Sequence, residues 1–274
     1  MVPPSRPGQG LSSRHRRPVH GRGRLADRHV ALIPLPSSRE RPAAVYRLHI
    51  ANKNYSSWSL RPWLLMSEMA IPFEERLTPF VADANWASFR AFSPTGQVPC
   101  LIDGELAVWD SLAIVEYLAE RHPGVWPTSA NARAWARSAC AEMHSGFRAL
   151  RDECPMNCGL RVRVTTPSEP LRHDLARLEE LWTQGLETFS GSFLAGETFT
   201  AVDAFFAPVA FRVQGFDLPL GAAARGYVER LLALPGMQAW YRAALAEPWR
   251  DQPHERKTLA AGERLVDHRD ASTA

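Results

Sequence analysis

The sequence predicts a small mixed α/β domain followed by a larger all-helical domain. Strand-like and helix-like segments alternate over residues 45–123, whereas only helical periodicity follows residue 130. A Pro/Gly-containing linker over residues 122–130 separates the two patterns. With 274 residues, the chain is long enough to give each domain a hydrophobic core.

The first domain has the element order β-α-β-α-β-β-α. Its last two strands flank Asp103–Gly104, a typical hairpin turn, where a strictly alternating fold would have a further crossover. The predicted strands lie within residues 45–51, 73–80 and 97–110, and the predicted helices cover residues 59–69, 85–93 and 111–123.

The second domain repeats apolar residues at helical spacing. One such stripe consists of Trp135, Ala139, Met143, Phe147 and Leu150. The predicted helices cover residues 131–155, 168–189, 200–213 and 222–247. The polar sequence beyond them predicts a flexible tail. The chain therefore divides into residues 1–44, a disordered basic extension; 45–122, the α/β domain; 131–250, the helical domain; and 251–274, the tail.

The first 45 residues carry nine arginines and only two acidic residues, whereas the rest of the chain is mildly acidic. Seven prolines and a lack of periodicity predict disorder there. The composition resembles a transit peptide, but the prolines would break its amphipathic helix, and the apolar centre of a secretory signal is missing. We treat residues 1–44 as a non-functional extension, whose deletion leaves activity and melting temperature unchanged.

Composition also limits the partners. The body of the chain has no basic face suited to nucleic acid, and no apolar run approaches the ~20 residues that cross a bilayer. The four cysteines, at positions 100, 140, 154 and 158, lack the spacing of a zinc site. We interpret the cysteines as reduced thiols in a cytoplasmic protein. From charge, hydropathy and cysteine spacing together, we expect no metal, nucleic-acid or membrane partner.

Pro99, in the segment QVPCL, would deny a hydrogen bond to a central strand. It is either an ordinary edge-strand proline or a cis proline at a turn. In the second case, the backbone N–H and C=O of Val98 face outward and can pair with an extended ligand.

Asp110 and Ser111 begin the helix over residues 111–123, and both residue types are good helix caps. A helix N-terminus also presents free N–H groups and a partial positive charge. A ligand carboxylate could bind Ser111 there while Asp110 holds a ligand ammonium. The pair therefore suits an amino-acid-like zwitterion.

Ser56, Ser57 and Ser59 stand at the first strand-to-helix junction. They are either caps or ligand contacts. No G-x-S-x-G motif surrounds them, so a hydrolase nucleophile is not indicated. A serine hydroxyl at a helix start can donate to a ligand thiolate and favour ionisation of a thiol whose free pKa is about 8.5.

Three motifs in order, SSWSLRPW, QVPCLIDG and WDSLAIVEYL, resemble the N-terminal, thioredoxin-like domain of cytosolic glutathione S-transferases. SSWSLR is similar to the zeta-class motif, in which the first serine assists the glutathione thiol. Counting back from Arg61 places Ser56 in that position, with Ser57 as the alternative. Omega-type members have cysteine there, so a serine argues against a mixed-disulfide mechanism. The resemblance covers roughly residues 46–247.

The resemblance implies a glutathione site. QVP is similar to the cis-proline loop of the family, so Val98 would pair with the cysteinyl backbone, Pro99 would position the peptide and Gln97 would assist the glycyl end. Asp110 and Ser111 would anchor the γ-glutamyl group. Glutathione is then the co-substrate.

The helical half agrees with this resemblance. The segment TFTAVDAFFAPV, residues 198–209, is similar to the second-domain segment of the family, in which Thr200 and Asp203 form a structural capping box. In this family the second substrate lies between the domains. The candidate residues for that pocket are Trp58, Met143, His144, Phe147 and Arg151.

These pocket residues have alternative roles. His144 and Arg151 either face a polar or anionic substrate or bridge the domains. The zeta pattern has cysteine at the position of Trp58, so its indole either covers the site and stacks on the second substrate or packs the domain interface. Because of this departure from the zeta pattern, the resemblance alone does not imply isomerisation of maleylacetoacetate, which stays one candidate reaction.

Together these patterns predict a homodimeric glutathione transferase of detoxification type, acting on a small electrophile by conjugation or isomerisation. Two alternatives remain open. One is a non-catalytic ligand-binding or assembly module on the same fold. The other is a glutathione-dependent reductase or peroxidase.

Overall fold

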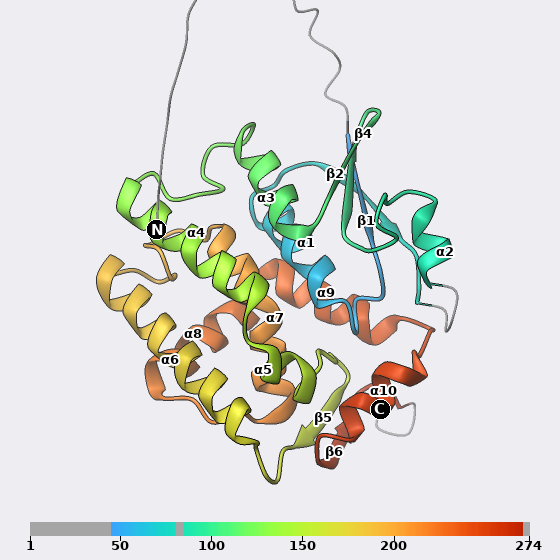
Figure 1. Ribbon diagram of the computed structural model, residues 1–274, viewed down its shortest axis with the longest axis vertical. Helices are drawn as coiled ribbons and strands as arrows, with labels where there is room; N and C mark the ends of the chain where they lie inside the picture. Colours follow the sequence, from blue (N-terminus) through green and yellow to red (C-terminus); the bar gives the residue numbers. More distant parts are fainter. Residues whose placement is uncertain (1–44, 81–84, 271–274) are drawn as a thin grey trace, which may run out of the picture. The chain divides into compact units, whose positions relative to one another are not determined.

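The computed structural model describes residues 45–80 and 85–270 (Figure 1). The predicted disordered extension over residues 1–44 lies outside this part of the chain. The first domain contains β1 (Tyr46–Ile50), α1 (Ser57–Glu68), β2 (Phe73–Leu77), α2 (Asn85–Arg90), β3 (Cys100–Asp103), β4 (Leu106–Trp109) and α3 (Ser111–Ala119).

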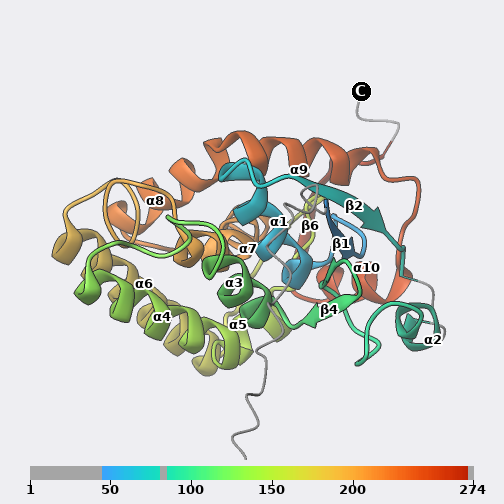
Figure 2. The ribbon, with the colours of Figure 1, turned by 90° about the horizontal axis from the view of Figure 1, so that it is seen from above.

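The four strands form one mixed sheet in the order β2-β1-β3-β4. β1 pairs in parallel with β2 and antiparallel with β3, and β3 pairs antiparallel with β4. Figure 2 shows α1 and α3 on one side of the sheet and α2 on the other. Leu48 and Leu101, paired across β1 and β3, are fully buried. This arrangement confirms the predicted thioredoxin-like domain.

The helical domain follows, as predicted. Its helices are α4 (Ala130–Ser145), α5 (Arg148–Glu153), α6 (Glu169–Phe189), α7 (Ala201–Phe216), α8 (Ala222–Ala233) and α9 (Pro235–Ala246). α7 lies at the centre, in contact with α1, α4 and α8. Every residue of α7 except Gln214 is buried, which explains why its sequence is apolar on all sides apart from the buried Asp203 and Arg212. Through α7, the helical domain packs directly against the first helix of the thioredoxin-like domain.

Two long helices predicted from periodicity are broken in the structure. The segment 131–155 divides at Gly146 and Phe147, where Phe147 adopts a left-handed conformation with φ 53°. A side chain at Gly146 would come within 2.8 Å of the Glu142 carbonyl oxygen, so this sharp turn requires glycine. The segment 222–247 divides at Leu234, because Pro235 begins a new helix and cannot donate a backbone hydrogen bond.

The segment expected to be a flexible tail is ordered up to residue 270. It contains α10 (Gln252–Leu259) and β6 (Glu263–Asp267), which pairs antiparallel with β5 (Leu160–Arg163) in a two-stranded sheet. Polar residues dominate this segment, so periodicity and hydropathy give no sign of order. Charge pairing holds it instead.

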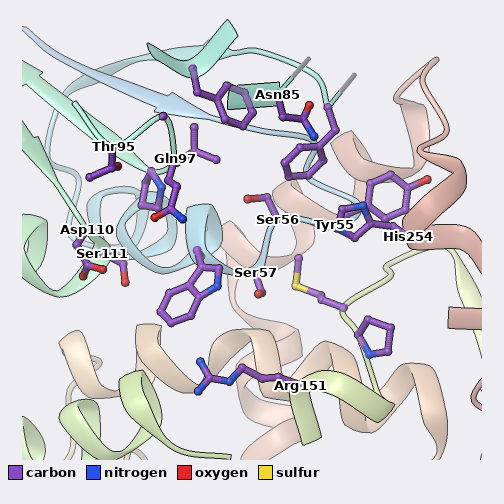
Figure 3. Close-up of a pocket in the computed structure, with 18 of the residues that line it drawn as sticks. Tyr55, Ser56, Ser57, Asn85, Thr95, Gln97, Asp110, Ser111, Arg151 and His254 are labelled. Carbon is purple, nitrogen blue, oxygen red and sulfur yellow. The ribbon is translucent and has the colours of Figure 1, made fainter. Parts of the chain in front are cut away.

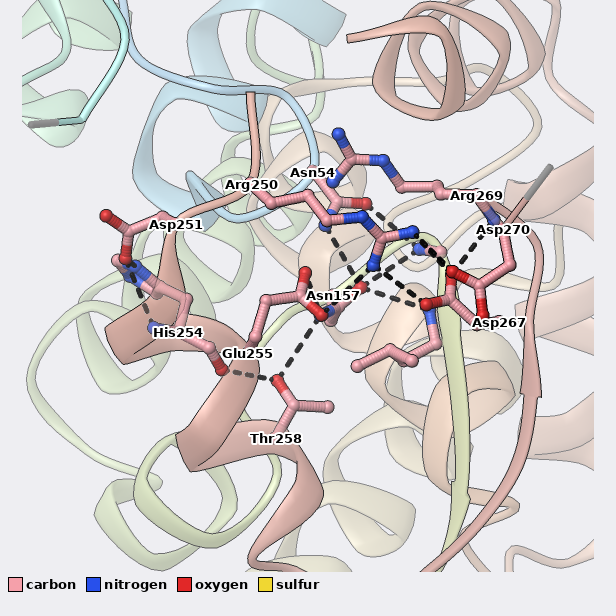
Figure 4. A network of polar contacts seen from close by, with 12 residues as sticks. Asn54, Asn157, Arg250, Asp251, His254, Glu255, Thr258, Asp267, Arg269 and Asp270 are labelled. Atoms are coloured by element: carbon pink, nitrogen blue, oxygen red, sulfur yellow. Dashed lines mark hydrogen bonds and ion pairs between the residues drawn. The ribbon is translucent and has the colours of Figure 1, made fainter. Parts of the chain in front are cut away.

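A polar network connects this C-terminal segment to the rest of the protein (Figure 4). Arg250 forms ion pairs with Asp267 at 2.8 Å and with Glu255 at 3.4 Å. The Tyr55 hydroxyl donates to Glu255 at 2.5 Å and accepts from Arg269 at 3.1 Å. Because Tyr55 immediately precedes Ser56, the C-terminal segment is attached to the loop that leads to the candidate serines.

The four cysteines are free and buried. Among the described residues, no helix is long and apolar enough to cross a bilayer.

Candidate functional site

A cavity of about 880 Å³ lies where the N-termini of α1 and α3 and the loop before β3 meet α5, α7 and α10 (Figure 3). Most of the ligand contacts expected from the sequence line this one cavity. They are Ser56, Ser57, Trp58, Gln97, Val98, Pro99, Asp110, Ser111 and Arg151.

Ser56 and Ser57 present their hydroxyls differently. Ser56 is the N-cap of α1, but its hydroxyl accepts no backbone N–H of the helix and instead donates to Ser59 Oγ at 2.7 Å. Ser59 Oγ also accepts the Ala51 backbone N–H at 3.3 Å, so it keeps a partner if Ser56 turns away. The Oγ of Ser57 accepts a hydrogen bond from Arg212 at 3.3 Å, which leaves its own proton free for donation.

The Val98–Pro99 peptide bond is cis. Val98 lies just before β3, whose pairing with β1 ends at the His49–Cys100 pair. Within the described residues, the Val98 N–H and C=O form no hydrogen bond. An extended peptide lying in the cavity can therefore pair with both groups.

Asp110 and Ser111 form a strained turn at the start of α3. Asp110 has φ 73°, a conformation that costs energy for a residue with a side chain, and its carboxylate accepts the Leu112 N–H at 2.8 Å. Ser111 is buried, yet its hydroxyl has no hydrogen-bond partner within the described chain. An unpaired hydroxyl beside a helix N-terminus, at the edge of a cavity, is suited to a ligand carboxylate.

The profile of the glutathione S-transferase N-terminal domain matches residues 55–121, and that of the C-terminal domain matches residues 168–243. The chain belongs to the glutathione S-transferase superfamily. The two matched segments contain the serines, the cis-proline loop, the Asp–Ser pair and most of α6–α9.

Individual relatives are more distant. Dichloromethane dehalogenase from Methylorubrum extorquens is 44% identical over 61 residues, which is 22% of this chain and 21% of that protein. The chain thus spans about a fifth of the length of this relative. A probable maleylacetoacetate isomerase from Vibrio cholerae is 29% identical over 161 residues, covering 56% of this chain and 74% of that protein.

A solved structure supports the fold. The glutathione transferase homolog from Burkholderia BGR1, with bound glutathione, superposes with a TM-score of 0.57 at 22% identity. The match covers 73% of this chain and 98% of the homolog.

The Trp58 indole contacts two guanidinium groups. Arg61 lies 4.2 Å from the indole centroid and Arg151 lies 5.3 Å from it. Arg61 is buried, and two of its side-chain nitrogens have no hydrogen-bond partner among the described residues. Burial lowers the pKa of Arg61 to about 9, so it remains charged at neutral pH. The indole therefore packs against arginines of both domains and also lines the cavity, whereas its stacking on a second substrate stays a prediction.

Three residues expected in the second-substrate pocket do not line the cavity. Met143, on the buried face of α4, and Phe147, which follows Gly146, are both part of the hydrophobic core. His144 contacts the edge of Trp58 and lies 3.5 Å from Asp110, which places it behind the cavity wall. Burial lowers the pKa of His144. Of His144 and Arg151, only Arg151 lines the cavity.

The cavity also contains residues that the sequence did not indicate. Arg212 of α7 is buried, and burial lowers its pKa to about 10. His254 and Lys257 of α10 complete the wall from the C-terminal segment. Asp251 followed by Pro253 is a helix-start signal for α10 that a search for caps could have found. No sequence signal placed α10 at the cavity.

Thr200 and Asp203 lie away from the cavity, at the start of α7. Asp203 accepts hydrogen bonds from the backbone N–H groups of Thr200 at 2.9 Å and Leu194 at 3.1 Å, and from the Tyr227 hydroxyl at 2.8 Å. The carboxylate thereby joins the start of α7 to the preceding loop and to α8.

Proposed function

We propose that this protein is a glutathione transferase, in which Ser56 stabilises the glutathione thiolate for attack on a small electrophile. One observation carries the proposal. A single cavity brings together a hydroxyl at a helix N-terminus, an unpaired backbone segment at Val98 and an unpaired hydroxyl at Ser111. These groups complement a thiol, a peptide backbone and an α-carboxylate, which are the parts of glutathione.

Each group has a definite role in this proposal. Asp110 holds the γ-glutamyl ammonium and Ser111 its carboxylate. Val98 pairs with the cysteinyl backbone beside Pro99, and Gln97 assists the glycyl end. Ser56 turns its hydroxyl from Ser59 to the sulfur, while Ser59 keeps the Ala51 N–H. Ser57 remains the alternative donor.

The chemistry follows from thiolate stabilisation. When the thiol ionises, the hydroxyl of Ser56 and the positive end of α1 both favour the negative sulfur. The thiolate then forms a C–S bond with an electrophilic carbon, and a leaving group departs or a proton adds to the neighbouring carbon. Reversible addition to an activated double bond would instead allow isomerisation, in line with the relative from Vibrio cholerae.

The test compares wild type with Ser56→Ala, using Ser138→Ala on the exposed face of α4 as the matched control. We expect wild type and Ser138→Ala to bind glutathione-agarose and conjugate glutathione. We expect Ser56→Ala to bind it but to lose about 10²-fold or more in kcat. Equal activity of Ser56→Ala and wild type would overturn the role of Ser56.

The same assay separates the alternatives. Retention on glutathione-agarose without turnover of any electrophile would favour a binding module. Turnover only with disulfides or hydroperoxides would favour a reductase or peroxidase. We further propose a cytoplasmic homodimer; buried free cysteines agree with a reducing compartment, and Leu106 and Trp109 expose apolar surface on the edge strand β4. Light scattering of the purified protein tests the dimer.

A further inference from the structure

The proposed function leaves the proton of the glutathione thiol without an acceptor. A serine hydroxyl can stabilise the thiolate, but it is not basic enough to take the proton at neutral pH. An ionisable group on the cavity wall could accept this proton.

Besides His254, the ionisable groups lining the cavity are Tyr55, Asp110, Arg151, Arg212 and Lys257. The guanidinium groups of Arg151 and Arg212 already carry their protons at neutral pH, and Lys257 is paired with Asp152 at 3.2 Å. The Tyr55 hydroxyl donates to Glu255, and burial raises its pKa to about 12. Asp110 belongs to the proposed γ-glutamyl site. His254 is the only histidine on the wall formed by the described residues.

His254 is held in one orientation. Its ring stacks on Tyr55, with centroids 5.1 Å apart, and on Phe80, with centroids 5.0 Å apart. Its Nδ1 lies 2.6 Å from the Asp251 carboxylate, which also caps α10 by accepting the His254 backbone N–H at 3.1 Å (Figure 4). Stacking and pairing thus orient the imidazole from three sides.

The pairing also determines the tautomer. A carboxylate can only accept a hydrogen bond, so the neutral imidazole carries its proton on Nδ1 and a free lone pair on Nε2. The side chain of His254 is 35% exposed, while that of Asp251 is only 8% exposed. With Nδ1 paired and the ring faces stacked, Nε2 is the ring nitrogen that remains for a ligand in the cavity that His254 lines. Figure 3 shows His254 across the cavity from Asp110 and Ser111, with Ser56 between them.

We propose that His254, oriented by Asp251, is the proton acceptor for the glutathione thiol. The S–H bond breaks, its electron pair stays on sulfur, and the proton moves to Nε2. The resulting imidazolium is paired with Asp251 and later gives the proton to the product carbon or to water. This inference rests on the proposed function. It also assigns a role to α10, which lies beyond residues 168–243 of the matched C-terminal domain.

The test is a set of pH profiles with matched variants. His254→Gln removes the base, Asp251→Asn removes the carboxylate but keeps a good N-cap, and His173→Gln on the exposed face of α6 is the control. We expect His254→Gln to lower kcat/KM about 10²-fold near neutral pH. The deficit should shrink as the pH approaches the thiol pKa of about 8.5 in solution, where the base is no longer needed. Asp251→Asn should lower kcat/KM by a smaller factor, and this deficit should shrink with rising pH in the same way. His173→Gln should match wild type.

Two further measurements distinguish a proton acceptor from a residue that only holds α10 in place. The ultraviolet absorbance of bound thiolate, followed against pH, should show the bound thiol ionising at higher pH in His254→Gln. Added imidazole should restore part of the activity of His254→Ala and none of that of Ser56→Ala. A variant with an unchanged pH profile, unchanged thiol ionisation and no rescue, altered only in KM or melting temperature, would overturn the proposal.

Failure of this inference is separable from failure of the proposed function. If wild type conjugates glutathione and Ser56→Ala does not, the proposed function stands whatever His254→Gln does. If wild type shows no glutathione-dependent turnover, both the proposed function and the role of His254 are wrong.

Discussion

Arg212 of the helical domain donates a hydrogen bond to Ser57 at the start of α1, across 3.3 Å. The neighbouring Ser56 donates to Ser59 instead. Two adjacent hydroxyls in one cavity therefore differ in their hydrogen bonding. Ser57 is tied to the domain interface, whereas Ser56 shares a hydrogen bond within its own helix turn that can be exchanged for a ligand.

This difference predicts opposite kinetic effects for the two serines. Ser56→Ala should lower kcat about 10²-fold or more with little change in the KM for glutathione, because it removes a donor to the developing thiolate. Ser57→Ala should change kcat less than about threefold and act mainly on stability, because it leaves Arg212 without one partner. Steady-state kinetics and thermal unfolding of both variants check this. The reverse pattern would make Ser57 the thiol contact.

Trp58 should govern which electrophiles are accepted. Trp58→Ala opens the cavity above Arg61, so the ratio of kcat/KM for a bulky electrophile to that for a small one should rise about tenfold or more. Trp58→Phe should lie between the two. Trp249→Ala is a suitable control, because Trp249 is 45% exposed and does not line the cavity. An unchanged ratio in Trp58→Ala would leave the indole a packing role only.

Tyr55 should link the C-terminal segment to the glutathione site. Tyr55→Phe removes the donor to the buried Glu255 and the acceptor for Arg269, and should cost about 2 kcal/mol of unfolding free energy. The KM for glutathione should also rise, because α10 forms part of the cavity wall. Denaturant unfolding and kinetics measure both effects. Tyr241→Phe, which loses a hydroxyl contact to Arg161 outside the cavity, should leave the KM unchanged.

Asp203 should make stability depend on pH. Burial raises its pKa from 3.8 to about 6 in spite of its hydrogen bonds. Between these values the folded state binds more protons than the unfolded state, so the contribution of Asp203 to stability is greatest below pH 4 and is lost as the pH rises to about 6. The loss amounts to about 3 kcal/mol, since one pKa unit corresponds to about 1.4 kcal/mol.

The Asp203→Asn variant isolates this contribution. It should be less stable than wild type, because an amide cannot accept all the hydrogen bonds that Asp203 accepts. The gap in unfolding free energy should widen as the pH is lowered from about 6 to about 4, since only wild type gains stability there. Urea unfolding at several pH values measures the gap. A gap that stays constant with pH would contradict the raised pKa.

The sequence was informative wherever a local pattern determines local structure. Alternating and helical periodicity located the strands and helices of the thioredoxin-like domain, and the Asp103–Gly104 pair located its hairpin. The cavity-lining positions of Ser56, Val98 and Asp110 also follow from local signals, because each stands at an element boundary. Helix breaks were less visible: the turn at Gly146 requires glycine because a side chain there would meet the Glu142 carbonyl oxygen, and periodicity does not detect this.

By itself, the sequence determined the two-domain order and the set of residues at the ends of α1, β3 and α3. The tertiary structure decided which side chains from other elements face those residues across the cavity. Met143 and Phe147 went to the core, while Arg212 and His254 reached the cavity. The reason is that α7 and α10 approach the cavity only through long-range contacts, such as Arg212 with Ser57 for α7 and Tyr55 with Glu255 for α10. Such contacts join residues far apart in the chain and leave no periodic trace in the sequence.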